Sequence, residues 1–291
     1  MTFAGTHTAL VTPFRDGVFD KPAFQSLIEA QIAGGITGII PVGTTGESPT
    51  LDHSEHLHVI DVAVQTAARR CLVIAGTGSN STDEAVSLTQ EAEKLGADAA
   101  LVVAPYYNKP SQEGLYRHFK AIAESVKFPI VLYSIPGRCG IEISVETTVR
   151  LARDCKNILA IKEAGGSVER VNQLRAALPD SFEILSGDDS LTLPFMSVGA
   201  IGVISVATNI IPAEVSKMVR HQLVGESAHA LAIHRKFYPL FKDLFIEPNP
   251  VPVKFALARS GHMTADVRLP LCEMSPANAE KLLATLQACS L

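Results

Sequence analysis

Residues 129–136, PIVLYSIP, and residues 158–165, ILAIKEAG, are two continuous apolar runs on either side of an amphipathic segment. Neither run alternates between apolar and polar residues, which is typical of parallel strands that are covered on both faces. Six further runs of this kind start at residues 7 (HTALVTPF), 38 (GIIPVG), 71 (CLVIAGTG), 99 (AALVVAP), 182 (FEILSGDD) and 202 (GVISVATN). Eight strand–helix units within about 225 residues predict an α/β fold of the (β/α)8 TIM barrel type, because an open doubly wound sheet rarely has so many.

The segments between these strands carry the signals that begin and end helices. Ser81 precedes two acidic residues and can cap a helix, and Pro212 can occupy the first turn of another. Gly96 and Gly225 can end helices, because glycine adopts the left-handed backbone conformation without a steric penalty. We therefore expect helices between the strands.

After Gly225 the strand signal stops, and the pattern predicts three helices, over residues 227–245, 252–260 and 275–289. No linker rich in Pro, Gly and Ser isolates them. We expect a catalytic barrel over residues 1–225 and a C-terminal helical extension over residues 226–291.

Composition narrows the class of protein. Of the 291 residues, 47% are apolar and 19% are charged, which excludes a disordered chain. The formal charge of −5 and the lack of a basic block argue against nucleic acid as a partner. No apolar run reaches the ~18 to 20 residues that span a bilayer, and no basic segment precedes the first apolar stretch. We therefore expect a cytoplasmic protein that does not bind membranes.

In such barrels the active site lies at the C-terminal ends of the strands. The run ILAIKEAG places Lys162 in an otherwise apolar strand, where desolvation lowers the pKa of the ammonium and leaves some free amine to attack a carbonyl. A lysine paired with Glu163 or another carboxylate fits the burial argument equally well.

Neighbouring strands end in further polar groups. Tyr133 is either a core aromatic or a phenol that shuttles protons beside Lys162. Thr44 and Thr45 lie in GTTGES, a turn that is either an ordinary polar loop or a site for a small carboxylate, since its amides and hydroxyls can donate hydrogen bonds. Arg138 is either solvated or a bidentate carboxylate ligand.

Two other groups of side chains attract notice. Tyr106 and Tyr107 follow the run AALVVAP, and adjacent aromatics on a rim are more often packing or interface residues than catalysts. His53, His56 and His58 do not form HExxH and have no nearby cysteine ligand, so we expect no metal there. The five cysteines are scattered without a CxxC pair, which argues against a structural zinc site and a disulfide framework.

Four motifs together resemble the dihydrodipicolinate synthase family of the pyruvate-dependent class I aldolase superfamily. They are GTTGE at 43–47, YxxxxR at 133–138, IKEAGG at 161–166 and SGDD at 186–189. The resemblance extends from ALVTPF at residue 9 to NPVPVKFAL at residue 249, and thus covers essentially the whole chain.

The resemblance implies condensation of pyruvate with aspartate semialdehyde on the route to diaminopimelate and lysine, with no metal or organic cofactor. Lys162 would form the Schiff base, and Arg138 would hold the carboxylate of the semialdehyde. The resemblance also implies a proton relay, a turn for the pyruvate carboxylate, and backbone contacts to the substrate. The relay would comprise Tyr133, Thr44 and Tyr107 of a neighbouring subunit in a homodimer or homotetramer; the turn would use Thr44 and Thr45; the backbone contacts would come from Gly187 and Ile204.

Two residues depart from the family pattern, since Ser134 and Gly137 stand where Asn and Ser are often found. The hydrogen bonding around the second substrate is therefore open. A sialic-acid lyase or sugar-acid aldolase would also use Lys162 and Tyr133, with less need for Arg138. A non-catalytic pyruvate or amino-acid sensor would require an impaired relay, and all three relay residues are present.

The resemblance further implies feedback inhibition by lysine. Six residues match the effector pocket of lysine-inhibited members of the family, namely Ser48, His53, His56, Asn80, Glu84 and Tyr106. Pro49 departs from the small residue that is usual at its position. A carboxylate such as Glu84 suits an ammonium ligand, and Tyr106 adjoins Tyr107, which offers a route for coupling between the two sites.

Overall fold

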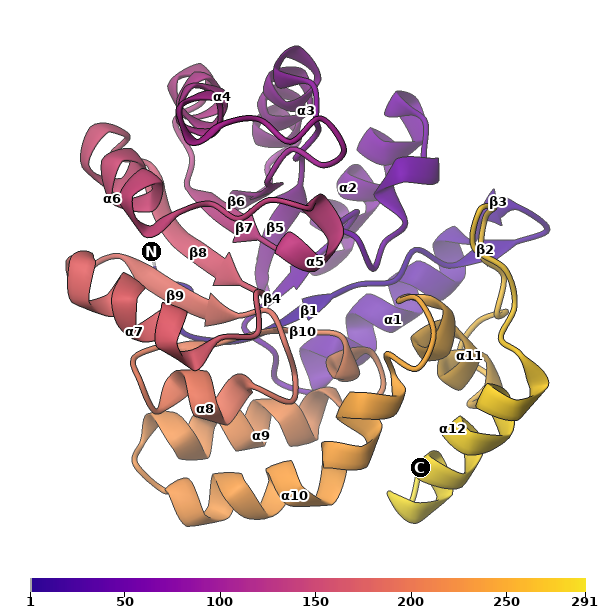
Figure 1. Cartoon of the computed structure of the whole chain (residues 1–291). Helices are drawn as coiled ribbons and strands as arrows, with labels where there is room; N and C mark the ends of the chain where they lie inside the picture. The colour runs from indigo at the N-terminus through magenta and orange to yellow at the C-terminus, as the bar shows by residue number, and fades with distance from the viewer. Residues whose placement is uncertain (1) are drawn as a thin grey trace.

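The fold is known from a computed structural model that describes residues 2–291. Eight parallel strands close into a barrel in the order β1-β10-β9-β8-β7-β6-β5-β4, with β1 pairing to β4 (Figure 1). The strands are β1 (Gly5–Ala9), β4 (Gly38–Ile40), β5 (Leu72–Gly76), β6 (Ala99–Val103), β7 (Ile130–Ser134), β8 (Ile158–Glu163), β9 (Glu183–Ser186) and β10 (Gly202–Ser205). The predicted (β/α)8 barrel is confirmed.

Every strand is shorter than the apolar run that predicted it. The first run extends to Phe14, whereas β1 ends at Ala9 and a small hairpin follows, formed by β2 (Phe14–Arg15) and β3 (Val18–Phe19). The residues that follow β1, β6 and β10 within these runs are buried in the loops at the C-terminal mouth of the barrel, whereas those that follow β7 and β8 are half-buried or exposed. Apolar runs therefore mark the strands and also part of the loops that follow them.

The helices surround the barrel as the punctuation predicts. They are α1 (Lys21–Ala33), α2 (His53–Ala67), α3 (Thr82–Leu95), α4 (Gln112–Ser125), α6 (Val145–Asp154), α7 (Val168–Ala177), α8 (Thr192–Met196) and α9 (Pro212–Leu223). Ser81 caps α3 by accepting a hydrogen bond from the Glu84 amide, and Gly96 ends that helix in the left-handed conformation. Pro212 opens α9.

Three short helices lie in loops at the mouth of the barrel: η1 (Ser48–Thr50) after β4, α5 (Pro136–Cys139) after β7 and η2 (Ala207–Asn209) after β10. They carry Ser48, Arg138 and Asn209, which thereby lie just beyond the C-terminal ends of the strands.

The C-terminal region contains α10 (Ser227–Asp243), α11 (Val251–Arg259) and α12 (Pro276–Ala288), each within two residues of its predicted ends. Figure 1 shows these helices together on one side of the barrel, where α10 packs against α9 and α12 packs against α10 and α11. The chain after α11 returns to the hairpin, where the Arg268 guanidinium donates to the Gly17 carbonyl (2.8 Å). Among residues 2–291, no helix has the length and apolar character needed to cross a bilayer.

Candidate active site

Lys162 and Tyr133 face each other at the mouth of the barrel. They are paired in register on the adjacent strands β8 and β7, and the Lys162 Nζ lies 4.2 Å from the centroid of the Tyr133 ring. Both side chains are buried. Parallel strands place residues of equal register side by side, so the sequence separation of the two residues does not keep them apart.

The surroundings of Lys162 favour the neutral amine. Burial, together with the charge of Arg138, lowers the pKa of Lys162 to about 7, although the Asp189 carboxylate opposes this shift. The alternative pairing with Glu163 is wrong. Side chains alternate along a strand, and Glu163 instead accepts a hydrogen bond from the Arg170 guanidinium (2.8 Å).

The turn after β4 carries Thr44 and Thr45. Its backbone closes on itself, because the Glu47 amide donates to the Thr44 carbonyl (3.1 Å). The Thr45 hydroxyl accepts a hydrogen bond from the side-chain amide of Asn249 (2.9 Å). Thr44 and Tyr133 line one small cavity of about 30 Å³. The turn is therefore held beside Tyr133 by groups from its own backbone and from the C-terminal region.

Burial also raises the pKa of the Tyr133 phenol, to about 12, while the charge of Arg138 and the hydroxyl of Thr44 lower it. The phenol therefore keeps its proton at neutral pH and can both donate and accept a hydrogen bond. Such a group suits proton transfer that passes through a hydroxyl pair.

Arg138 lies on α5, just beyond the strand that carries Tyr133. Its guanidinium donates to the Asn249 carbonyl (3.3 Å), and its charge shifts the pKa values of both Lys162 and Tyr133. The two departures from the family pattern lie close by. The buried Ser134 hydroxyl accepts a hydrogen bond from the Ile143 amide (3.4 Å), and a Cβ at Gly137 would meet no atom within 4 Å.

Gly187 and Ile204, the two residues expected to offer backbone groups to the substrate, lie in different surroundings. The Gly187 amide donates to the Glu163 carbonyl (2.8 Å), so this amide is already engaged within the barrel. A Cβ at Gly187 would lie 3.0 Å from Cε of Lys162, which explains the glycine beside the lysine. Ile204 is buried in β10, in register with His7 of β1.

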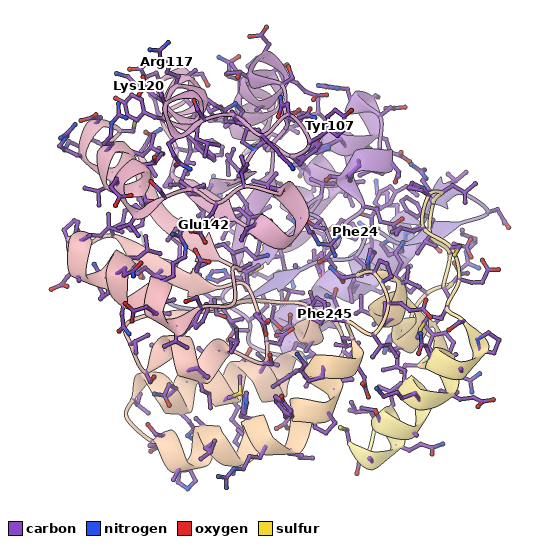
Figure 2. The ribbon with its side chains drawn as sticks, viewed as in Figure 1. Phe24, Tyr107, Arg117, Lys120, Glu142 and Phe245 are labelled. Carbon is purple, nitrogen blue, oxygen red and sulfur yellow. The ribbon has the colours of Figure 1, made fainter. Side chains whose placement is uncertain are left out.

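Tyr107 does not join Tyr133 and Thr44 within one chain. Its side chain is 89% exposed and its backbone has φ +74°. Figure 2 shows it in the loop region near α2 and α3, outside the ring of strands. The single chain therefore brings together two of the three relay residues.

A second cavity, of about 120 Å³, lies next to the site. Five of the six predicted effector residues line it: Ser48, His53, His56, Glu84 and Tyr106. Asn80 is not among the lining residues, and its carbonyl accepts a hydrogen bond from the Asn108 side chain (2.8 Å). Ser79, which the sequence analysis did not select, also lines the cavity and donates a hydrogen bond to Glu84. Ser48 and Gly78 line both cavities, so the two share a wall.

The histidines of α2 do not converge on one point. His56 is hydrogen-bonded to the Gly76 carbonyl (2.8 Å), and burial lowers its pKa, whereas His58 lines a different cavity together with Arg268. In the described part of the chain, the group with metal-ligand spacing is His221, Glu226 and His229 at the junction of α9 and α10. Helices of a barrel run opposite to its strands, so this junction lies at the face away from the site.

The C-terminal region contributes contacts that the sequence analysis did not anticipate. Asn249 reaches both Thr45 and Arg138, and Lys254 pairs with Glu47 of the GTTGE turn. The signal was present in NPVPVKFAL, where a lysine and an asparagine interrupt an apolar stretch. This pattern shows that the two residues are buried, but it does not show that their partners lie in the barrel.

Comparison with known proteins shows the family of the chain. The model of the dihydrodipicolinate synthetase family matches residues 2–289. A 4-hydroxy-tetrahydrodipicolinate synthase from Aquifex aeolicus is 52% identical over 285 residues, which cover 98% of this chain and 97% of the relative.

Solved structures are similarly close. The 4-hydroxy-tetrahydrodipicolinate synthase of Methylacidiphilum fumariolicum SolV superposes with a TM-score of 0.99 at 55% identity, covering 99% of this chain and 96% of that one. The lysine-bound enzyme of Cyanidioschyzon merolae superposes with a TM-score of 0.97 at 43% identity, covering 99% of each chain.

Proposed function

Because the chain belongs to the dihydrodipicolinate synthetase family, we propose that it condenses pyruvate with L-aspartate 4-semialdehyde to give 4-hydroxy-tetrahydrodipicolinate, in the biosynthesis of diaminopimelate and lysine. Within the site, the observation that carries this assignment is the buried Lys162 beside Tyr133. The lowered pKa of Lys162 supplies free amine at neutral pH. We place the reaction in the cytoplasm.

The chemistry begins with attack of the Lys162 amine on the keto carbon of pyruvate. Loss of water gives a protonated imine, which is an electron sink, and removal of a methyl proton gives the enamine. The enamine carbon attacks the aldehyde carbon of the second substrate, which restores the imine, and the aldehyde oxygen takes up a proton. The amine of the semialdehyde then attacks the imine carbon, which closes the ring and frees Lys162. None of these steps requires a metal or an organic cofactor.

Two carboxylates must be held during these steps. The Thr44–Thr45 turn would bind the carboxylate of pyruvate through its hydroxyls and amides, with Ile204 and Gly187 forming the adjacent wall. Arg138 would bind the carboxylate of the semialdehyde, and its position beyond the lysine supports that assignment, because the second substrate must approach from the mouth.

Protons would move through Tyr133, Thr44 and Tyr107, with Tyr107 supplied by a second copy of the chain. The exposure of Tyr107 supports this proposal, because the phenol is accessible for contact with a second copy of the chain. The enzyme would therefore act as a homo-oligomer, either a dimer or a tetramer built from two dimers.

We further propose that lysine inhibits the enzyme from the cavity beside the site. Glu84 would pair with an ammonium of the effector, and Ser48, His53, His56 and Tyr106 would surround the ligand, with Asn80 in the adjacent loop. The wall shared through Ser48 supports coupling to the cavity of Thr44 and Tyr133.

Borohydride reduction in the presence of pyruvate tests the central step. Wild-type protein should gain the mass of a reduced pyruvate adduct on Lys162, and Lys162→Ala should gain none. Absence of an adduct in the wild type, or its persistence in the variant, would exclude the Schiff-base mechanism. Turnover with a panel of aldehydes, coupled to a dihydrodipicolinate reductase, then distinguishes the synthase from a sugar-acid aldolase.

A further inference from the structure

A fully buried ion pair joins the C-terminal region to the turn that carries Thr44 and Thr45. It links the Lys254 ammonium on α11 to the Glu47 carboxylate, and the two side chains are 0% and 1% exposed. Burial of two charges is costly, and an apolar pair of similar volume often gives equal or greater stability. A contribution to stability therefore does not by itself explain why two charged residues occupy these positions.

Glu47 has an unusual backbone for its residue type. Its φ is +56°, in the left-handed region, and it is not a glycine. A non-glycine residue persists there only when its surroundings hold it in place. Both carboxylate oxygens are engaged, since Oε1 faces Lys254 and Oε2 accepts a hydrogen bond from the Arg268 amide (3.0 Å). Groups from the C-terminal region thus hold the side chain of this strained residue.

The position of Glu47 determines the position of the turn. Its amide donates to the Thr44 carbonyl (3.1 Å), so Glu47 closes the turn. Gly46, the residue before it, leaves little room for adjustment, because a Cβ there would lie 2.9 Å from the Val42 backbone. A shift of Glu47 would therefore move Thr44 and Thr45 with it.

Lys254 is held as firmly as its partner. Its Nζ donates to the Asp266 carbonyl (2.9 Å) and lies 4.3 Å from the centroid of the Phe14 ring. Burial lowers the pKa of Lys254 to about 8, although Glu47 opposes the shift. The lysine is thus engaged on several sides. Asn249, which precedes α11, contacts Thr45 of the same turn.

We infer that Lys254 and Glu47 are a positioning pair, which sets the geometry of the Thr44–Thr45 turn for the carboxylate of pyruvate. The inference rests on the proposed function, because it assigns that turn to the substrate anion. The lysine also neutralises a carboxylate that would otherwise repel the substrate anion nearby. Neither residue contacts the reacting atoms, so both act through the turn.

The double variant Glu47→Gln/Lys254→Met tests the pair without leaving a buried charge. The glutamine can still accept the hydrogen bond from Arg268, and the methionine occupies much of the lysine's volume. We expect a folded protein in which KM for pyruvate rises at least about tenfold while kcat changes less than about threefold. The pyruvate concentration that gives half-maximal borohydride trapping on Lys162 should rise in parallel. Equal KM and equal half-saturation in this variant and the wild type would overturn the inference.

Glu47→Gln alone provides a second variant if the double variant fails to fold. Lys254 can then lose its proton and remain buried as a neutral amine, because its pKa is already lowered. The half-saturation for trapping should again rise, and an unchanged value would overturn the inference.

Lys281→Met is a control for the loss of a C-terminal ion pair elsewhere in the fold. Lys281 pairs with Asp243 (3.0 Å) between α12 and α10, so its loss removes a C-terminal ion pair that does not reach the turn. Its KM for pyruvate should equal that of the wild type, whereas a rise like that of the double variant would overturn the assignment to the turn. Absence of trapping in the wild type would instead reject the proposed function.

Discussion

The Lys162 ammonium and the Tyr133 ring are 4.2 Å apart, at equal register on two neighbouring parallel strands. The ring offers its electron-rich face to the cation, but it also replaces the water that would hydrate the charge. The loss of hydration is larger, since the pKa of Lys162 is lowered to about 7. The same contact therefore positions the amine and keeps part of it neutral.

This pKa predicts the pH dependence of adduct formation. A lowered lysine pKa means that the reactive neutral amine increases as pH rises towards 7 and is nearly complete by about pH 8. The rate of imine formation with pyruvate, measured by reductive trapping and mass spectrometry, should rise about tenfold per unit at low pH and level off above about pH 8. A rate that continued to rise tenfold per unit between pH 8 and 9.5 would indicate an unperturbed lysine.

Replacement of Arg138 should separate the two substrates. Arg138 is exposed in the free chain, and the bound semialdehyde would bury its contact with the guanidinium. Arg138→Ala should then weaken transition-state binding of the semialdehyde by about 2 to 4 kcal/mol, the cost of deleting one partner of a charge pair that becomes buried. Arg138→Lys should recover only part of the loss, because an ammonium cannot form the bidentate contact. Pyruvate trapping on Lys162 should persist in both variants. Equal loss for the two substrates in steady-state kinetics would contradict the assigned role.

The exposure of Tyr107 predicts that activity depends on assembly. Sedimentation should show at least a dimer, and Tyr107→Phe should lower turnover while leaving the pyruvate adduct intact. Tyr238→Phe is a suitable control, because this half-exposed phenol lies on α10. A monomer with undiminished activity would refute the shared relay.

Lysine should inhibit the wild-type enzyme partially and without competing with the semialdehyde. Glu84→Thr should relieve the inhibition, since it removes the carboxylate that faces the cavity. Glu91→Thr on the same helix is the control, because Glu91 pairs with Lys94 at the surface. Initial rates in millimolar lysine measure both effects. Full wild-type activity under these conditions would remove the regulatory proposal and leave the catalytic one intact.

Much of the molecule follows from local sequence. The eight apolar runs predicted the barrel, because burial on both faces leaves no polar alternation in a parallel strand. The starts of α3 and α9 were predicted from Ser81 and Pro212, and the end of α3 from Gly96. Such signals are local, since capping depends on residues that are adjacent in the chain. The rule that barrel sites lie beyond the strand ends then directed attention to Lys162, Tyr133, Thr44 and Arg138. Those residues do converge on the mouth of the barrel.

Contacts between distant segments required the tertiary structure. Glu163 is adjacent to Lys162 in sequence, yet the pleat turns it towards Arg170, and Asp189 is the acidic group that influences the lysine. The cavity beside the site includes Ser79 and excludes Asn80, a difference of one residue that depends on how the loop turns.

The Glu47–Lys254 pair spans more than 200 residues of the chain and joins two segments that the sequence pattern assigned to separate parts of the molecule. Amphipathic spacing shows which residues of a helix are buried, but it carries no information about which distant side chain each one meets. Only the packing of α11 against the mouth of the barrel decided that partner, because a buried charge takes the complementary charge that the closed fold brings within reach.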